Sequence, residues 1–122
     1  MSTANKLVPT VTAKTANYTF TNTDWGGIFT NRGATGGITF TLPAVSATPV
    51  GAYVEVFVAA NQDVTVASTA DEMITFNDID ANAVAWTTSS EKLGAAAKFL
   101  CDGTSWLCFL MTEETQTTSV TT

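Results

Sequence analysis

Hydrophobic and polar residues alternate with a period of two along most of the chain between Thr15 and Met111. This period is typical of β-strands with one buried and one exposed face. In segment 18–21 the two aromatic residues share one face and the two threonines share the other. Segment 38–42 repeats the pattern, and Pro43 ends it because proline cannot donate a hydrogen bond to a strand ladder. Both segments are therefore predicted strands with their apolar side chains turned inward.

The clearest strand in the sequence is segment 51–58. Its alternation places three valines on one face and three larger residues on the other, namely Val54, Val56 and Val58 against Tyr53, Glu55 and Phe57. A strand that is apolar on both faces lies at the centre of a sheet or is covered by another chain. This segment is therefore a candidate for both the core and a subunit interface.

Two stretches carry strong turn signals. Segment 25–43 contains five of the eight glycines and a closing proline, which predicts a tight β-hairpin. Segment 99–111 contains Asp102-Gly103, a pair that favours hairpin turns because glycine accepts the positive φ that they require. If that turn centres on residues 103 and 104, Cys101 faces Trp106 and Cys108 faces Phe99. The two sulfurs are then not partners, and we expect buried free thiols in a reducing cytosol.

Shorter strands are expected at segments 28–30, 64–66, 73–76 and 84–86, and segment 92–98 is expected to be a loop. Eight or nine short strands without helices predict an all-β fold, a compact antiparallel sandwich or barrel. The expected organisation is an extended N-terminal arm (1–14), one β domain (15–111) and a polar, frayed C-terminal tail (112–122). The apolar residues of the arm favour a strap that orders on a neighbouring subunit over a disordered terminus.

The composition suggests that part of the surface is hidden in an assembly. Charged residues make up 13% of the chain against 45% hydrophobic residues, and threonine supplies 24 of the 122 residues. So few charges on a small domain favour an oligomer over a monomer with a plain uncharged surface. The net charge of −6 and the scattered Lys and Arg residues argue against binding to nucleic acid. Without a signal-like segment or a run of ~18–20 apolar residues, we expect a protein that is made in a cytosol, stays soluble and has no membrane partner.

The residues offer little catalytic chemistry. Histidine is absent, and no serine or cysteine has a base to activate it. The carboxylate pairs Asp71/Glu72 and Asp78/Asp80 lie beside turn residues, so solvated turns are favoured over a glycosidase pair. Segment 77–82 places oxygen-bearing side chains at alternate positions, but a turn built by Asn and Asp is favoured over a calcium loop. We expect no enzymatic activity, cofactor or metal.

Trp25, Trp86 and Trp106 raise the alternative of a platform that stacks on sugars, as in carbohydrate-binding domains. On the strands of a small β domain, aromatic residues more often serve as core or interface anchors. Trp106 lies in an apolar hairpin and is expected in the core. Trp25, beside two glycines, is expected to be the most exposed of the three.

Several strings together resemble a small β domain of the structural proteins of tailed bacteriophages. They are YTFT (18–21), FTNRGATG (29–36), ITFTLP (38–43) and CDGTSW (101–106), and the resemblance covers about residues 15–111. Such domains occur in head decoration (cement) proteins and in head- or tail-fibre proteins. The resemblance implies a homotrimeric virion protein without enzymatic activity, and it assigns no binding residue.

We therefore expect a decoration protein that binds the outer capsid surface as a homotrimer and stabilises the shell, with itself and the major capsid protein as partners. The alternative is a head- or tail-fibre protein that binds a receptor or carbohydrate; a fibre is usually longer than this chain. The expected capsid contacts are Lys6, Leu7, Val8, Pro9 and Val11. The expected subunit interface includes Trp25, Tyr53, Glu55 and Phe57, within the wider strands 53–58 and 106–111.

Overall fold

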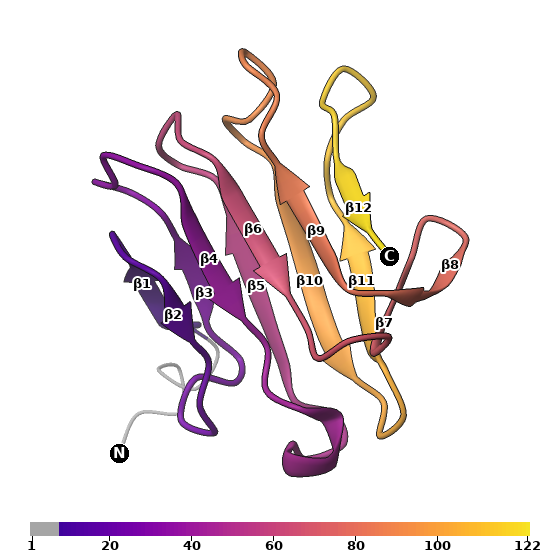
Figure 1. Cartoon of the computed structure of the whole chain (residues 1–122). Helices are drawn as coiled ribbons and strands as arrows, with labels where there is room; N and C mark the ends of the chain where they lie inside the picture. The colour runs from indigo at the N-terminus through magenta and orange to yellow at the C-terminus, as the bar shows by residue number, and fades with distance from the viewer. Residues whose placement is uncertain (1–7) are drawn as a thin grey trace, which may run out of the picture.

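In the computed structural model, which describes residues 8–122, the chain folds into two β-sheets packed face to face (Figure 1). The seven-stranded sheet has the order β1-β3-β5-β10-β11-β7-β8, with bounds Val11–Ala13, Ile28–Thr30, Tyr53–Phe57, Ala96–Cys101, Trp106–Leu110, Met73–Thr75 and Asp78–Ala81. The five-stranded sheet has the order β12-β9-β6-β4-β2, with bounds Ser119–Thr121, Ala83–Trp86, Val64–Ala67, Ile38–Thr41 and Tyr18–Thr19. A short 3-10 helix, η2 (Val45–Ala47), lies between β4 and β5. The predicted all-β sandwich is confirmed.

The first six strands alternate between the two sheets and form three stacked coils. Strands β1, β3 and β5 pair in parallel in one sheet, and β2, β4 and β6 pair in parallel in the other. Each coil therefore contributes one strand to each sheet. Both sheets are mixed, so the antiparallel pairing expected for the sandwich is not found among these six strands.

The predicted hairpin over segment 25–43 is also wrong, because β3 and β4 belong to different sheets. The glycine-rich connection between them turns the chain from one sheet to the other. Gly33 in this corner has a φ of +87°, a conformation that favours glycine. Hairpins and sheet-to-sheet corners use the same turn residues, so the local sequence does not distinguish them.

Antiparallel strands complete both sheets. Strand β9 pairs with β6, and β10 pairs with β5 and β11. In the β10–β11 hairpin, Cys101 lies opposite Trp106 and Phe99 lies opposite Cys108, as predicted. Gly103 in its turn has a φ of +95°. The two cysteines are free; Cys101 is buried as expected, whereas Cys108 is half-buried.

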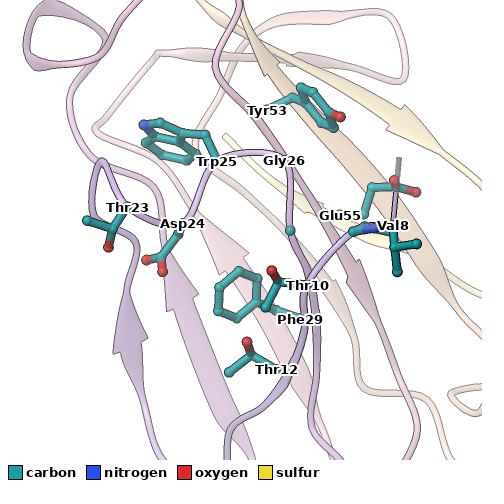
Figure 2. A pocket seen from close by; sticks show the side chains of 12 residues that line it. Val8, Thr10, Thr12, Thr23, Asp24, Trp25, Gly26, Phe29, Tyr53 and Glu55 are labelled. Carbon is teal, nitrogen blue, oxygen red and sulfur yellow. The ribbon is translucent and has the colours of Figure 1, made fainter. Parts of the chain in front are cut away.

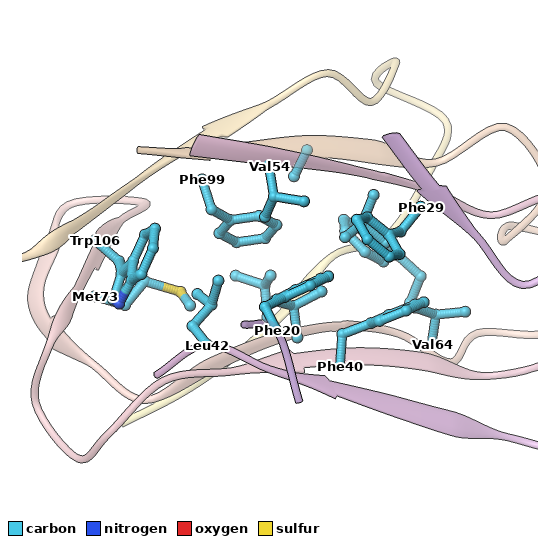
Figure 3. Packing of buried hydrophobic residues seen from close by; sticks show 14 of the residues in the cluster. Phe20, Phe29, Phe40, Leu42, Val54, Val64, Met73, Phe99 and Trp106 are labelled. Atoms are coloured by element: carbon cyan, nitrogen blue, oxygen red, sulfur yellow. The ribbon is translucent and has the colours of Figure 1, made fainter. Parts of the chain in front are cut away.

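The core lies between the sheets and is rich in aromatic rings (Figure 3). The rings of Phe20 and Phe40 stack with centroids 5.5 Å apart, and Phe29 from the opposite sheet packs on Phe20 at 4.9 Å. Trp86 and Trp106 are fully buried, so their indole N–H groups need internal acceptors. The Trp86 N–H donates to Thr118 Oγ1 and the Trp106 N–H donates to the Pro43 carbonyl.

Further differences concern strand number and the two ends of the chain. The described residues form twelve strands, more than the eight or nine expected. Strand β10 begins inside the expected loop at 92–98. The frayed tail is wrong at residues 119–121, which form β12 and pair with β9. Within the expected N-terminal arm, residues 11–13 form β1 and pair with β3.

Candidate interaction surface

The most unusual surface of the molecule is the outer side of the seven-stranded sheet. The strand register aligns its outward side chains in rows that cross the strands: Val11, Ile28, Glu55, Lys98 and Phe109 in one row, Thr30, Phe57 and Ala96 in the next, and Tyr53, Leu100, Leu107 and Ile74 in a third. Met111, whose backbone N–H donates to the Ala96 carbonyl, extends the second row. We call this surface the outer face. Solvated sheet faces are normally polar, but the outer face is mostly apolar.

Large apolar side chains on the outer face are exposed to solvent. Phe57, Phe109 and Met111 are 42%, 49% and 46% exposed, respectively. Phe57 and Met111 also line a shallow hollow of about 360 Å³ between β3, β5 and β10. A contiguous exposed apolar surface with a hollow is typical of a site that another protein covers.

One pair of opposite charges lies within this apolar surface. Glu55 and Lys98 are directly opposite on the antiparallel strands β5 and β10. The Lys98 ammonium lies 4.5 Å from the centroid of the Tyr53 ring, a cation–π contact. All three side chains are half-buried. Because charged groups at an interface favour one orientation of the partner, this pair would orient a protein that binds the outer face.

A second hollow, a cleft of about 430 Å³, lies where the segment before β1 passes the loop before β3 (Figure 2). Its lining combines rings, hydroxyls and carboxylates, including Thr10, Thr12, Thr23, Asp24, Trp25, Tyr53 and Glu55. Figure 2 shows Trp25 and Tyr53 on either side of the loop at Gly26, with Phe29 below them.

Asp24 organises one wall of the cleft. Its Oδ2 atom accepts hydrogen bonds from the Tyr18 hydroxyl at 2.7 Å and from the Thr21 backbone N–H at 2.8 Å. The bond to Asp24 is the main cause that raises the pKa of Tyr18, followed by burial and the charge of Asp24. The phenol therefore stays a neutral donor, and it holds the carboxylate in place.

The predicted interface residues separate into two groups. Tyr53, Glu55 and Phe57 lie together on the outer face. Trp25 does not: its ring is half-buried, packs 5.6 Å from the Trp106 ring and donates its N–H to Asn22 Oδ1. It is less buried than the other two tryptophans, as expected.

The predicted capsid contacts lie around the start of β1. Val8, Pro9 and Val11 are exposed, and Val8 and Pro9 line the cleft. Lys6 and Leu7 lie outside the described residues. The structure thus brings the three described members of this group close to the edge of the outer face, where Val11 lies beside Ile28.

The sequence reasoning missed Lys98, Phe109 and Met111 as individual surface residues. A signal for two of them is present: once Trp106 is inward in the last hairpin, alternation turns Phe109 and Met111 outward. That these residues share a face with Tyr53 follows from the pairing of β5 with β10, which links strands that are far apart in sequence.

The turn expected over the acidic segment 77–82 is found only in part, because residues 78–81 form strand β8 and an Asx turn lies within them. The Asp80 backbone N–H donates to Asp78 Oδ1 at 2.9 Å, and residues 78–81 continue as β8. Asn82 Oδ1 accepts the backbone N–H of Asp71. Within residues 8–122, no group of three or more His, Cys, Asp and Glu side chains is placed to hold a metal ion.

No protein-family model matches the chain, and no curated protein matches it. In the described part of the chain, no helix has the length and hydropathy that a membrane span requires.

Proposed function

We propose that this protein is a structural protein of a bacteriophage particle, a decoration (cement) protein that binds the outer surface of the head as a homotrimer. The observation that carries the proposal is the apolar outer face, which offers contact area and no arrangement for chemistry. The resemblance of segments 18–21, 29–36, 38–43 and 101–106 to phage structural domains supplies the biological setting.

In this proposal the outer face supplies the subunit contact. Tyr53, Glu55 and Phe57 become buried against a neighbouring copy together with Phe109 and Met111. Burial of apolar surface stabilises association by about 25 cal/mol for each Å² removed from water. The exposed segment around Val8, Pro9 and Val11 contacts the major capsid protein, and bridging neighbouring capsid subunits reinforces the shell.

Self-association through the outer face is tested by sedimentation velocity. The wild-type protein is expected to form a trimer of its 12.8 kDa chain at micromolar concentration. Replacing Phe57 and Phe109 by serine should shift the protein toward monomer without loss of the fold. Val50→Ser is the matched control, because Val50 is exposed on a loop outside the outer face. A double variant that remains trimeric would contradict the assignment of this face.

The location is tested by electron microscopy of phage particles that carry a labelled form of the protein. Label over the outer head surface is the expected result, and heads that lack the protein should release DNA at lower temperature. Label confined to fibres would replace the decoration role by the fibre role. Particles without label would contradict both.

One observation favours the fibre alternative with carbohydrate binding. The cleft of about 430 Å³ places Trp25 and Tyr53 near two carboxylates, Asp24 and Glu55. Aromatic rings that stack on sugar faces and carboxylates that accept sugar hydroxyls would suit a neutral saccharide. Glycan-array binding that is abolished by Trp25→Ala and retained by Phe57→Ser would support this function over decoration.

A further inference from the structure

The β7–β8 hairpin is the most acidic part of the described chain. Residues 71–80, which we call the acidic hairpin, contain four carboxylates and no lysine or arginine: Asp71, Glu72, Asp78 and Asp80. In Figure 1 the hairpin projects from the sandwich beside β11 and β12. Its second strand, β8, is the last strand of the seven-stranded sheet.

The tip of the acidic hairpin combines exposure with backbone strain. Phe76 and Ile79 are 60% and 68% exposed. Phe76 has a φ of +47° and Asn77 has a φ of +60°, so both central residues of the turn are left-handed. Asparagine or glycine suits such a turn, whereas phenylalanine does not. A strained and exposed phenylalanine gains nothing from the fold of a single copy, which points to a contact with another molecule.

The opposite edge of the same sheet carries basic and apolar side chains. Strand β1 is its first strand, and Val11 there is 65% exposed. Lys14 follows β1 and lies 3.8 Å from the centroid of the Tyr18 ring, while Arg32 is exposed in the adjacent corner after β3. Two carboxylates lie beside this edge, because Asp24 and Glu55 line the same cleft as Val8, and Asp24 is held by Tyr18. We call Val8, Val11, Lys14 and Arg32 the basic edge.

We propose that the acidic hairpin of one copy of this chain binds the basic edge of a second copy. The exposed charges are opposite, Asp71 and Asp80 on the hairpin and Arg32 on the edge, and both surfaces expose apolar side chains. The other two carboxylates, Glu72 and Asp78, are half-buried and accept hydrogen bonds from the Val45 backbone N–H and the Thr122 hydroxyl of the same copy. They lie at opposite edges of one sheet, so the contact cannot form within a single copy. Each of the two edge strands pairs on one side alone among the described residues, so the neighbouring copy approaches an open sheet edge.

This contact is head-to-tail, because it joins two different surfaces. A head-to-tail contact closes into a ring when its rotation permits and otherwise forms an open filament. The inference shares with the proposed function the claim that copies of this chain bind one another, but it assigns Val8 and Val11 to a second copy in place of the capsid protein. Its test variants change Arg32, Asp80 and Phe76, none of which belongs to the outer face. The two interfaces are therefore separable by mutation.

Charge reversal tests the contact directly. Arg32→Glu and Asp80→Lys each place like charges in the contact, and each should weaken self-association by about tenfold or more in sedimentation velocity at low salt. The double variant R32E/D80K restores opposite charges and should recover association. Glu114→Lys changes the charge by the same amount as Asp80→Lys at an exposed site outside the hairpin, and it should have no effect.

A second variant separates binding from folding. Phe76→Asn removes the apolar tip and relieves the strained turn, so its melting temperature should rise while its self-association falls by about tenfold. Loss of association in a more stable protein cannot be attributed to misfolding. A variant that associates like the wild type would overturn the role of the tip.

The outcomes separate this inference from the proposed function. Association that ignores both charge reversals, or that the double variant fails to recover, overturns the head-to-tail contact and leaves the outer-face assignment standing. A chain that is monomeric at all concentrations contradicts both. Loss of association in the charge variants with no change in the Phe57/Phe109 serine variant supports the contact and contradicts the outer face.

Discussion

Asn31 is a polar side chain that is fully buried, and its bonds hold two coils together. Its Oδ1 atom accepts the backbone N–H groups of Ala59 and Ala60, and its Nδ2 atom donates to the Ala60 carbonyl. The asparagine follows β3, whereas residues 59 and 60 follow β5. One side chain thus bonds three backbone groups of the next coil, of which the Ala60 carbonyl also accepts the Gln62 backbone N–H.

Replacing Asn31 by alanine is expected to lower the free energy of unfolding by about 2–4 kcal/mol, because it leaves partly buried backbone groups unpaired. Urea denaturation measures the effect. Asn17→Ala is the matched control: Asn17 is exposed and accepts a single bond, from the Thr39 backbone N–H, so its loss should cost less than about 1 kcal/mol. Equal effects at the two positions would contradict the role assigned to Asn31.

Cys108 makes the stability of the fold depend on pH in the alkaline range. Burial raises the pKa of its thiol to about 11 and outweighs a hydrogen bond with Thr75, which lowers the pKa. The thiolate is disfavoured in the folded protein but not in the unfolded chain. The folded state therefore binds the proton more tightly.

Stability from this thiol is fully present below about pH 9 and is lost as pH rises through 11, by at most about 3 kcal/mol. Denaturation curves at pH 8 and pH 10.5 measure the loss, and Cys108→Ala should show a smaller loss than the wild type. The same pH dependence in both proteins would assign it to other groups.

At the scale of elements, the alternation of side chains predicted most strands and the direction in which their residues point. The inward positions of Ile38, Phe40 and Leu42 needed no more than the period of two. The pairing of the strands was harder to predict from the sequence, because the glycine-rich corner after β3 has the same turn residues as a hairpin. Strand β12 escaped prediction because residues 112–122 are polar and threonine-rich, and its pairing depends on the distant strand β9.

The terminal strand should nevertheless contribute to stability. Thr118 accepts the N–H of the buried Trp86, and Val120 packs against the core. Deleting residues 112–122 should lower the melting temperature by several degrees, since it exposes β9 and leaves an indole N–H unpaired. Thr118→Val isolates the hydrogen bond and should produce part of the loss. An unchanged melting temperature after deletion would mean that β12 contributes nothing.

At the scale of the whole molecule, the sequence predicted three of the side chains on the outer face but not the extent of that face. Period-two alternation placed Tyr53, Glu55 and Phe57 on the same face of one strand. Adding Val11 and Phe109 required the register that aligns β1, β3, β5, β10 and β11, which no local pattern contains. The charge contrast between the two sheet edges likewise appears only when the strand order is known.

All three tryptophans belong to or pack against one core, so the described chain is expected to unfold as a single cooperative unit. Tryptophan fluorescence and far-UV circular dichroism should give coincident denaturation curves. A fluorescence transition that precedes the loss of strands would instead indicate that the coils near Trp25 open independently.

The three stacked coils have an evolutionary consequence. Each coil offers the next one the same pair of parallel hydrogen-bonding edges, and corner asparagines fasten successive turns to one another. Duplication or loss of one turn would therefore lengthen or shorten the protein while leaving the antiparallel half intact. Relatives of this chain should differ in size by whole turns, with their variable region near the amino terminus.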